Sequence, residues 1–368
     1  MMKEIFRRLL SFMVLGAAMA LALPAAHALT PVQQATQDGL SYMEDHAVPW
    51  RMNNGGCVGC HVQGAAIKAL SVGVEKGYAI DPGSLPSLIA DLKAHTLPSG
   101  EVDWMTAGTA WAAFGLRYYQ KYAAGKPDGV GGFYADESAY LNQLAGYLAT
   151  QQQPNGRVWN SWNEPPTQQG NLQTTAYAAM AWEAAGGFAA NLVLADAFLA
   201  TDPGTGILQM VQDEVSRILG LRATGRPPSD PVIAASVANL KAWQHPDGGW
   251  SETAGRASNA FATGQAIVGL NEGGEPFVTG DGGPIDRGIN WLLANQITDP
   301  LDPNFGAWPA GDTQSFRVGG ALFGYTMWPV NALEEVVPPP ALKGRMTGGG
   351  SITGSRVTHG FELHCDAS

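Results

Sequence analysis

The segment that decides the fold is RGINWLLANQITDPLDPNFGAW, residues 287–308. It joins a helix-forming stretch to a glutamine, a turn rich in Pro, Asp, Asn and Gly, and a closing tryptophan. Two partial copies lie upstream, YLATQQQPNGRVW at 147–159 and LKAWQHPDGGW at 240–250. A motif that recurs in this way indicates a repeat protein whose units are a helix followed by a turn.

A second pattern recurs between these segments and indicates a second set of helices. Its eight residues begin with a polar or small residue and are dominated by Ala and Gly at helical spacing. The long interval between its third and fourth copies predicts a hidden copy, best placed at 206–221. The copies begin at Gln63, Thr109, Thr175, Thr263 and Val318. They alternate with amphipathic segments at 33–46, 84–96, 136–151, 189–200, 231–244 and 284–296, which predicts six helical hairpins.

The first set of segments resembles the QW repeats of terpenoid cyclases, such as squalene-hopene cyclases, and of protein prenyltransferases. The resemblance covers residues 33–330 and implies an all-α fold, an α/α toroid of six inner and six outer helices with a ligand cavity at the N-terminal ends of the inner helices. The matching residues are Arg287, Gly288, Trp291, Leu292, Gln296, Gly306 and Trp308. In such repeats the glutamines and tryptophans are structural braces, which here implies Gln152, Gln244, Gln296, Trp159, Trp250 and Trp308.

The known chemistries of these families are not supported by the motifs in this sequence. The sequence has no D-x-D-D cluster of the kind that protonates an alkene in squalene-type cyclases, and it is too short for their two toroids. The zinc ligands of prenyltransferases and the Gly-Cys-Gly-Glu-Gln segment of complement-like thioester domains are not found either. The resemblance therefore predicts the fold and leaves the activity open.

The most informative chemical motif is Cys57-Val58-Gly59-Cys60-His61, a C-x-x-C-H sequence. Two thiols at this spacing can add to the two vinyl groups of one porphyrin, and the following imidazole then lies beneath the iron. We therefore predict one covalent haem c, bound through Cys57 and Cys60, with His61 as the proximal iron ligand. A disulfide between the two cysteines, a thioredoxin-like redox pair and half of a zinc site are the alternatives.

The second axial ligand of the haem is predicted from the alignment of the repeats. Met105 stands four residues before Thr109, as Gly59 stands four residues before Gln63, so Met105 should lie level with the haem motif on the adjacent inner helix. Met and His are the usual second ligands in c-type cytochromes. Met105 is the first candidate, His95 and His46 are the runners-up, and an open iron site is the remaining possibility.

Residues at the starts of the inner helices are predicted to line one cavity, because inner helices in a ring share one orientation. Aromatic and amide side chains dominate this set, which includes Gln173, Asn259 and Gln314. Asp103 is the only acid squarely among them, and an N-cap of a helix at 104–122 is its expected role.

The two ends of the chain differ from the repeat region. Residues 1–28 combine a basic start, an apolar run and the small-residue site Ala26-His27-Ala28, which predicts a signal peptide cleaved after Ala28 and a periplasmic or secreted protein. No other stretch is long and apolar enough to predict a membrane span. The toroid is expected at 29–334, a Pro-rich linker at 335–344, and the start of a small β-type module, complete or truncated, at 345–368, where the pairing of Cys365 stays open.

Charge and motifs together leave two classes of function. A formal net charge of −11 argues against nucleic-acid binding and allows attraction of a basic redox partner. The first class is a periplasmic electron-transfer protein with a redox partner. The second is a haem-dependent enzyme acting on an apolar, isoprenoid-like small molecule in the toroid cavity. A non-redox surface or binding protein comes third, because covalent haem has no evident purpose in it.

Overall fold

The computed structural model describes residues 29–53, 60–103, 105–160, 170–312, 321–336, 345–351 and 358–364. The chain divides into two compact units. One comprises residues 31–340 and is helical, and the other comprises residues 1–30 and 341–368.

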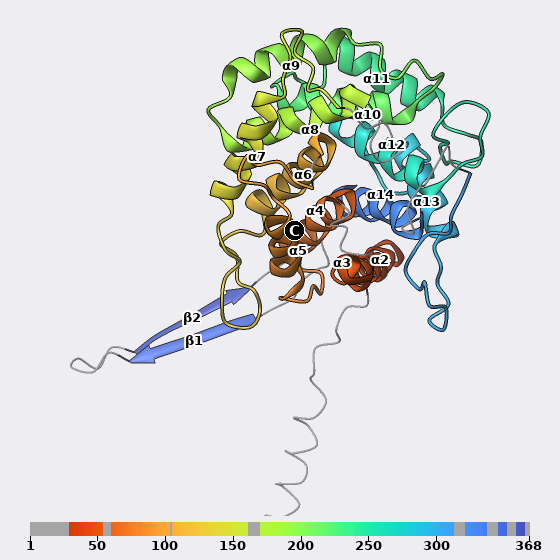
Figure 1. Ribbon diagram of the computed structural model, residues 1–368. Coiled ribbons are helices and arrows are strands. Elements are labelled where there is room, and N and C mark those ends of the chain that lie inside the picture. Colours follow the sequence, from red (N-terminus) through yellow and green to blue (C-terminus); the bar gives the residue numbers. More distant parts are fainter. Residues whose placement is uncertain are drawn as a thin grey trace, which may run out of the picture. The chain divides into compact units, whose positions relative to one another are not determined.

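The helical unit is a closed double ring, as Figure 1 shows. Six inner helices, counted over the described residues, follow one another around the axis, and the last packs against the first. They are α4 (Cys60–Lys76), α6 (Thr106–Tyr122), α8 (Gly170–Ala185), α10 (Val211–Ala223), α12 (Ala260–Glu272) and α14 (Ala321–Val336). Helix α10 is the hidden copy that the sequence predicts at 206–221.

The outer helices cover the inner ring and match the predicted amphipathic segments closely. They are α2 (Pro31–Ala47), α5 (Ser84–Ala94), α7 (Ser138–Thr150), α9 (Ala189–Thr201), α11 (Pro231–Ala242) and α13 (Pro284–Asn295), with a short additional helix α3 (Trp50–Asn53). Proline occupies the first turn of α11 and α13, where its missing N–H costs nothing, and Asp230 caps α11 by accepting from Val232 and Ile233. The all-α toroid is confirmed.

Small residues let the inner helices approach closely. A Cβ atom added to Gly64 of α4 would overlap the backbone of Trp111 in α6, and one added to Gly264 of α12 would overlap the backbone around Trp328 and Pro329 in α14. Glycine is therefore required at these two crossings for steric reasons. The Ala- and Gly-rich composition of the eight-residue pattern follows from this packing.

A threonine that opens the pattern ties α6, α8 and α12 to the turns before them. The backbone N–H of Val102 donates to Thr109 Oγ1 at 2.8 Å, that of Val158 to Thr175 Oγ1 at 2.8 Å, and that of Trp250 to Thr263 Oγ1 at 2.9 Å. We call this first residue of the pattern the anchor. Because these threonines satisfy a buried N–H of the turn, they hold α6, α8 and α12 in register with their outer partners.

The last copy has its anchor later than the sequence predicts. The N–H of Trp308 donates to Thr326 Oγ1 at 3.2 Å, so Thr326 has the anchor's role in α14. Val318, where the copy was expected to begin, lies outside the described residues. The first copy is placed by packing, because Gly64 meets α6 as Gly264 meets α14, and this puts Gln63 at the anchor position of α4.

The predicted glutamine braces join successive repeats. Gln152 Nε2 donates to the carbonyl of Gly156 in its own turn and to that of Asn191 in α9. Gln244 bonds in the same way to Gly248 and Pro284, and Gln296 to Gly306 and Ala35, at 2.8–2.9 Å. The bond from Gln296 to Ala35 joins α13 to α2 and so helps to close the ring.

Two of the three predicted tryptophan braces are confirmed. Trp250 and Trp308 are fully buried and donate through Nε1 to the carbonyls of Leu240 and Leu292 at the ends of their outer helices. Trp159 is wrong as a brace, because its side chain is 44% exposed and the buried Val158 occupies the equivalent place. The turn at 152–158 brings the valine rather than the tryptophan against the anchor threonine.

Replacing Gln244 by leucine should lower the free energy of unfolding by about 1–3 kcal/mol, because the carbonyls of Gly248 and Pro284 lose their donor. Urea unfolding followed by circular dichroism would measure the change. Gln143→Leu is the matched control, since Gln143 is exposed and makes one long bond of 3.5 Å to Leu97. Equal midpoints for the two variants would contradict the brace.

The second unit contains an antiparallel hairpin of β1 (Arg345–Ser351) and β2 (Thr358–His364). Its register pairs Arg345 with His364 and Ser351 with Thr358. The predicted β-type segment at the C-terminus is thus present as two strands, while Cys365 lies outside the described residues. Helix α14 continues to Val336, two residues beyond the predicted end of the toroid at 334.

Candidate functional site: the ring axis

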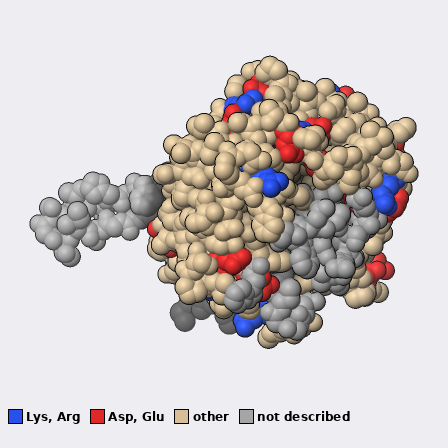
Figure 2. All heavy atoms as spheres, turned by 45° about the horizontal axis from the view of Figure 1, so that its top comes forward, with Lys and Arg blue, Asp and Glu red and all other residues tan. Residues whose placement is uncertain are grey.

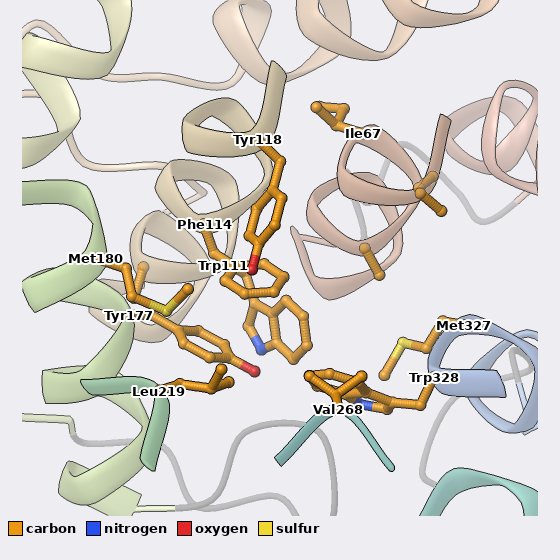
Figure 3. Close-up of a cluster of buried hydrophobic side chains, with 14 of the residues drawn as sticks. Ile67, Trp111, Phe114, Tyr118, Tyr177, Met180, Leu219, Val268, Met327 and Trp328 are labelled. Atoms are coloured by element: carbon orange, nitrogen blue, oxygen red, sulfur yellow. The ribbon is translucent and has the colours of Figure 1, made fainter. Parts of the chain in front are cut away.

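Aromatic side chains meet at the axis of the inner ring (Figure 3). Trp111 and Phe114 of α6 contact Tyr177 of α8, with ring centroids 4.9 and 4.5 Å apart, and Trp328 of α14 lies 6.3 Å from Trp111. All four are at most 2% exposed. These residues stand two or five positions after an anchor, so those positions face the axis. Edge-to-face, tilted and stacked packing of such rings makes an apolar floor across the ring.

His61 lies on the first turn of α4 and faces the same axis. It precedes Lys68 by seven residues, so both are on one face of the helix, and Lys68 lies at the axis, with its Nζ 4.7 Å from the centre of the Tyr118 ring. The His61 ring is 6.5 Å from that of Trp111 in an edge-on arrangement. Burial lowers the pKa of His61 to about 4.

Within the C-x-x-C-H motif, His61 is the residue whose side chain the structure describes. An imidazole with a low pKa is uncharged at neutral pH, which is the form that ligates iron. Cys60 opens α4 directly before His61. Cys57 lies outside the described residues. Within the described ranges, no group of three or more His, Cys, Asp or Glu side chains is arranged to hold a metal ion.

The three candidates for the second axial ligand lie in different parts of the ring. Met105 is the N-cap residue of α6, the neighbour of α4, and packs partly buried against the core. His95 caps the end of α5 and His46 lies in the last turn of α2, stacked on Tyr42 at 3.8 Å. The Nδ1 atoms of His46 and His95 contact carbonyls of their own helices at 2.8 and 2.9 Å. The distal ligand stays a prediction.

Asp103 does not cap α6, contrary to expectation. Met105 is the N-cap residue, and Asp103 lies before it in the left-handed backbone region with φ 50°. Partial burial raises the pKa of Asp103, and the nearby His95 opposes this shift. Asn259, another residue predicted at the start of an inner helix, is the N-cap of α12, and its side chain accepts from the N–H of Ala262 at 2.9 Å. Gln314 lies outside the described residues.

Three buried glutamines face the axis from adjacent inner helices, and we call them the glutamine arc. Gln173, Gln212 and Gln265 are 3%, 2% and 2% exposed. Gln212 precedes Leu219 by seven residues, Gln173 precedes Tyr177 by four and Gln265 precedes Val268 by three, and the latter residue of each pair points to the axis in Figure 3. Residues at these spacings share one helix face.

A polar cluster lies further along the axis, toward the C-terminal ends of the inner helices. Lys68 Nζ, fully buried, donates to Asn331 Oδ1 at 2.9 Å and to Glu335 Oε1 at 2.5 Å. The neighbouring Glu334 is also fully buried, and neither of its carboxyl oxygens has a hydrogen-bond partner. Burial raises the pKa of Glu334 well above 4.5. A cavity of about 280 Å³ opens at this end, lined by Arg117, Gln120, Lys121, Glu183 and Ala184.

No motif in the sequence predicts Gln212 or the polar cluster as part of a site. A glutamine or lysine within an Ala-rich helix carries no motif, so its importance depends on which face it occupies. Aligning the copies on their anchors would have placed Lys68 and Asn331 on the axis, because each follows its anchor by five residues. Glu335 follows Thr326 by nine residues, as Tyr118 follows Thr109.

The surface gathers no basic patch on the face drawn in Figure 2, where Lys and Arg are scattered among acidic and uncharged residues in the described part of the chain. Over the described residues, no helix combines the length and the apolar character needed to cross a bilayer.

Solved structures of similar fold include type II terpene cyclases. The chain aligns with a variant of MstE from Scytonema, in complex with its substrate geranylgeranyl dihydroxybenzoate, at 17% identity and a TM-score of 0.55, covering 83% of this chain and 97% of that one. The apo form of MstE aligns at 16% identity and a TM-score of 0.53, covering 84% and 99%. No family model and no curated protein matches the chain. The protein therefore has the all-helical ring fold of the terpene cyclases.

Proposed function

We propose that this protein is an exported c-type haem protein with a redox role, and that its single haem lies at the N-terminal end of the ring axis. The observation that carries the proposal is the position of His61, which follows the two motif cysteines and faces the axis from the first turn of α4. Cys57 and Cys60 would form the thioether bonds and His61 the proximal bond to iron.

The residues around His61 have defined parts in this proposal. A bound haem would supply a one-electron iron couple. Trp111 packs edge-on against His61 and limits the motion of the imidazole, and the aromatic floor behind it keeps solvent from the axis. Such an apolar surrounding is one of the factors that set a haem's potential.

The test is the visible spectrum of the full chain expressed with haem-maturation machinery. A c-type band that survives denaturation and extraction shows covalent haem, and the double variant Cys57→Ser, Cys60→Ser should lose it. Retention of the band by that variant, or no band in the wild type, would refute the proposal. Mass spectrometry of the exported protein tests the export prediction, since cleavage after Ala28 leaves Leu29 as the first residue.

Carbon monoxide separates the two redox functions. A reduced band that carbon monoxide does not shift means a closed, six-coordinate iron and supports electron transfer with a periplasmic partner. A shifted band means an exchangeable site and supports the second candidate, a haem-dependent enzyme acting on an apolar, isoprenoid-like molecule. The aromatic floor favours this candidate, because apolar walls with a few polar groups are typical of small-molecule sites.

Replacing Met105 by alanine should convert a carbon-monoxide-insensitive protein into a sensitive one, because the iron loses its distal sulfur. Low-spin absorption, including the weak methionine–iron band near the red end of the spectrum, should disappear. Met210→Ala is the matched control, since Met210 is the buried N-cap residue of α10 as Met105 is the N-cap residue of α6. An unchanged spectrum in the Met105 variant would direct the search to His95 and then His46.

A further inference from the structure

We propose that the N-terminal end of the ring axis binds an uncharged, planar ligand of the quinone and hydroquinone class. Its polar edge would be held by the glutamine arc, and above all by Gln212. The aromatic floor of Trp111, Tyr177 and Trp328 would receive its ring. This inference deepens the proposed function, on which the choice of a redox-active class rests.

The main observation is that Gln212 is a buried polar group without a hydrogen-bond partner. Its side chain is 2% exposed, and both its amide nitrogen and its amide oxygen lack a hydrogen-bond partner. Buried amides in folded proteins are almost always paired, since an unpaired one forfeits the hydrogen bonds it made to water. An unpaired amide that faces the axis is explained if a ligand supplies the missing partners.

A second unpaired group lies in the layer just below. The indole Nε1 of Trp328 is buried and has no acceptor. Gln265 of the neighbouring α12 is level with it, because each stands two residues after its anchor threonine. An acceptor atom of a ligand at the axis would pair with Trp328 while another of its polar atoms pairs with Gln212.

The opposite wall of this site is the haem side. In the ring order α4, α6, α8, α10, α12, α14, helix α10 stands across the axis from α4. Gln212 and His61 therefore extend from the first turns of opposite helices. A ligand that bonds to Gln212 would lie between the amide and the side of the ring that carries the haem motif.

The chemistry of these groups selects an uncharged ligand. A carboxamide donates through Nε2 and accepts through Oε1, so it can pair with a carbonyl or with a hydroxyl. The glutamine arc brings no formal charge, and the nearest axial ion pair, Lys68 with Glu335, lies deeper, beyond the aromatic floor. Carbonyl and hydroxyl groups at one position are what a quinone and its hydroquinone present. The flat faces and edges of the floor suit a planar ring.

The experiment is a calorimetric titration of the purified full chain with a decyl-substituted benzoquinone, its hydroquinone and decylbenzene. The two polar probes should bind and decylbenzene should bind more weakly. Gln212→Leu should weaken the polar probes about tenfold, as expected for lost neutral hydrogen bonds, and leave decylbenzene unchanged. Gln143→Leu, at an exposed site, is the matched control.

A second readout distinguishes a ligand site from a structural role. Because Gln212 is unpaired without ligand, Gln212→Leu should raise the urea midpoint of the ligand-free protein. A lowered midpoint with unchanged binding would overturn the inference, as would equal binding of decylbenzene and the polar probes, or no binding at all. Absence of covalent haem in a protein that still binds the probes would refute the proposed function and leave this site standing. Covalent haem in a protein that does not bind the probes would refute this site and leave the proposed function standing.

Discussion

Replacing Lys68 by methionine should lower the free energy of unfolding by about 3–5 kcal/mol. Lys68 is fully buried, and its ammonium group is the partner of the Glu335 carboxylate, which is 11% exposed. Without Lys68 that carboxylate stays in an apolar surrounding and has lost the paired cation that offsets its lost hydration. Asn331 also loses its donor.

Chemical denaturation of the purified variant measures this effect, and a second substitution tests its cause. The double variant Lys68→Met, Glu335→Met removes both charges, so it should recover most of the lost stability. Lys126→Met is the matched control, because Lys126 and Glu75 form an ion pair at the surface, which is worth only about 0–1 kcal/mol. If the double variant were as unstable as Lys68→Met, packing rather than charge would be the cause.

Glu334 should make the protein less stable as the pH rises above 4.5. Burial raises the pKa of this carboxyl group in the folded state, so the folded protein keeps a proton that the unfolded chain has lost. The unfolded state then binds fewer protons, and the free energy of unfolding falls by up to ~1.4 kcal/mol per pH unit from 4.5 to the folded-state pKa. The protonated Glu334 therefore costs the folded state nothing below pH 4.5, and the loss of stability is greatest above the folded-state pKa.

The variant Glu334→Gln isolates this effect, because glutamine has the shape of the protonated acid and no charge to bury. Its stability should match that of the wild type near pH 4 and exceed it increasingly toward pH 8, as measured by urea midpoints across the range. Glu183→Gln changes an exposed carboxylate and should follow the wild-type curve. Parallel curves for Glu334→Gln and the wild type would show that this carboxyl group has no raised pKa.

The helices were predictable because the start, the end and the apolar face of each are visible in its own sequence. Outer helices such as α11 and α13 begin at proline, end before a turn and carry one apolar face. Gln244 and Gln296 were predictable as braces because their bonds lie within the turn and the next helix, and the motif repeats. The prediction for Trp159 was wrong because contact with α8 decides whether Val158 or Trp159 is buried. The N–H of Val158 donates to Thr175 of α8, so the valine is the buried residue.

The site was less predictable, because it depends on the rotation of each helix about its own axis. The C-x-x-C-H motif identified His61 as a candidate, and the repeats predicted its position at the start of the first inner helix. Gln212 and Glu334 become meaningful only once the ring is closed, since their neighbours come from other repeats. A covalent motif can be read along the chain, whereas an unpaired amide or a raised pKa exists only in the assembled core.

Ring closure also constrains the order in which this chain can fold. The bonds from Gln296 to Ala35 and from Lys68 to Glu335 join residues 261 and 267 positions apart, so the first repeat waits for the last. Open repeat arrays can lose an end unit and keep the rest, because each unit depends only on its neighbours. A closed ring has no end unit to lose. Nascent chains that have not yet delivered α14 must expose the partner surfaces of α2 and α4, which makes the unfinished chain vulnerable to aggregation until synthesis is complete.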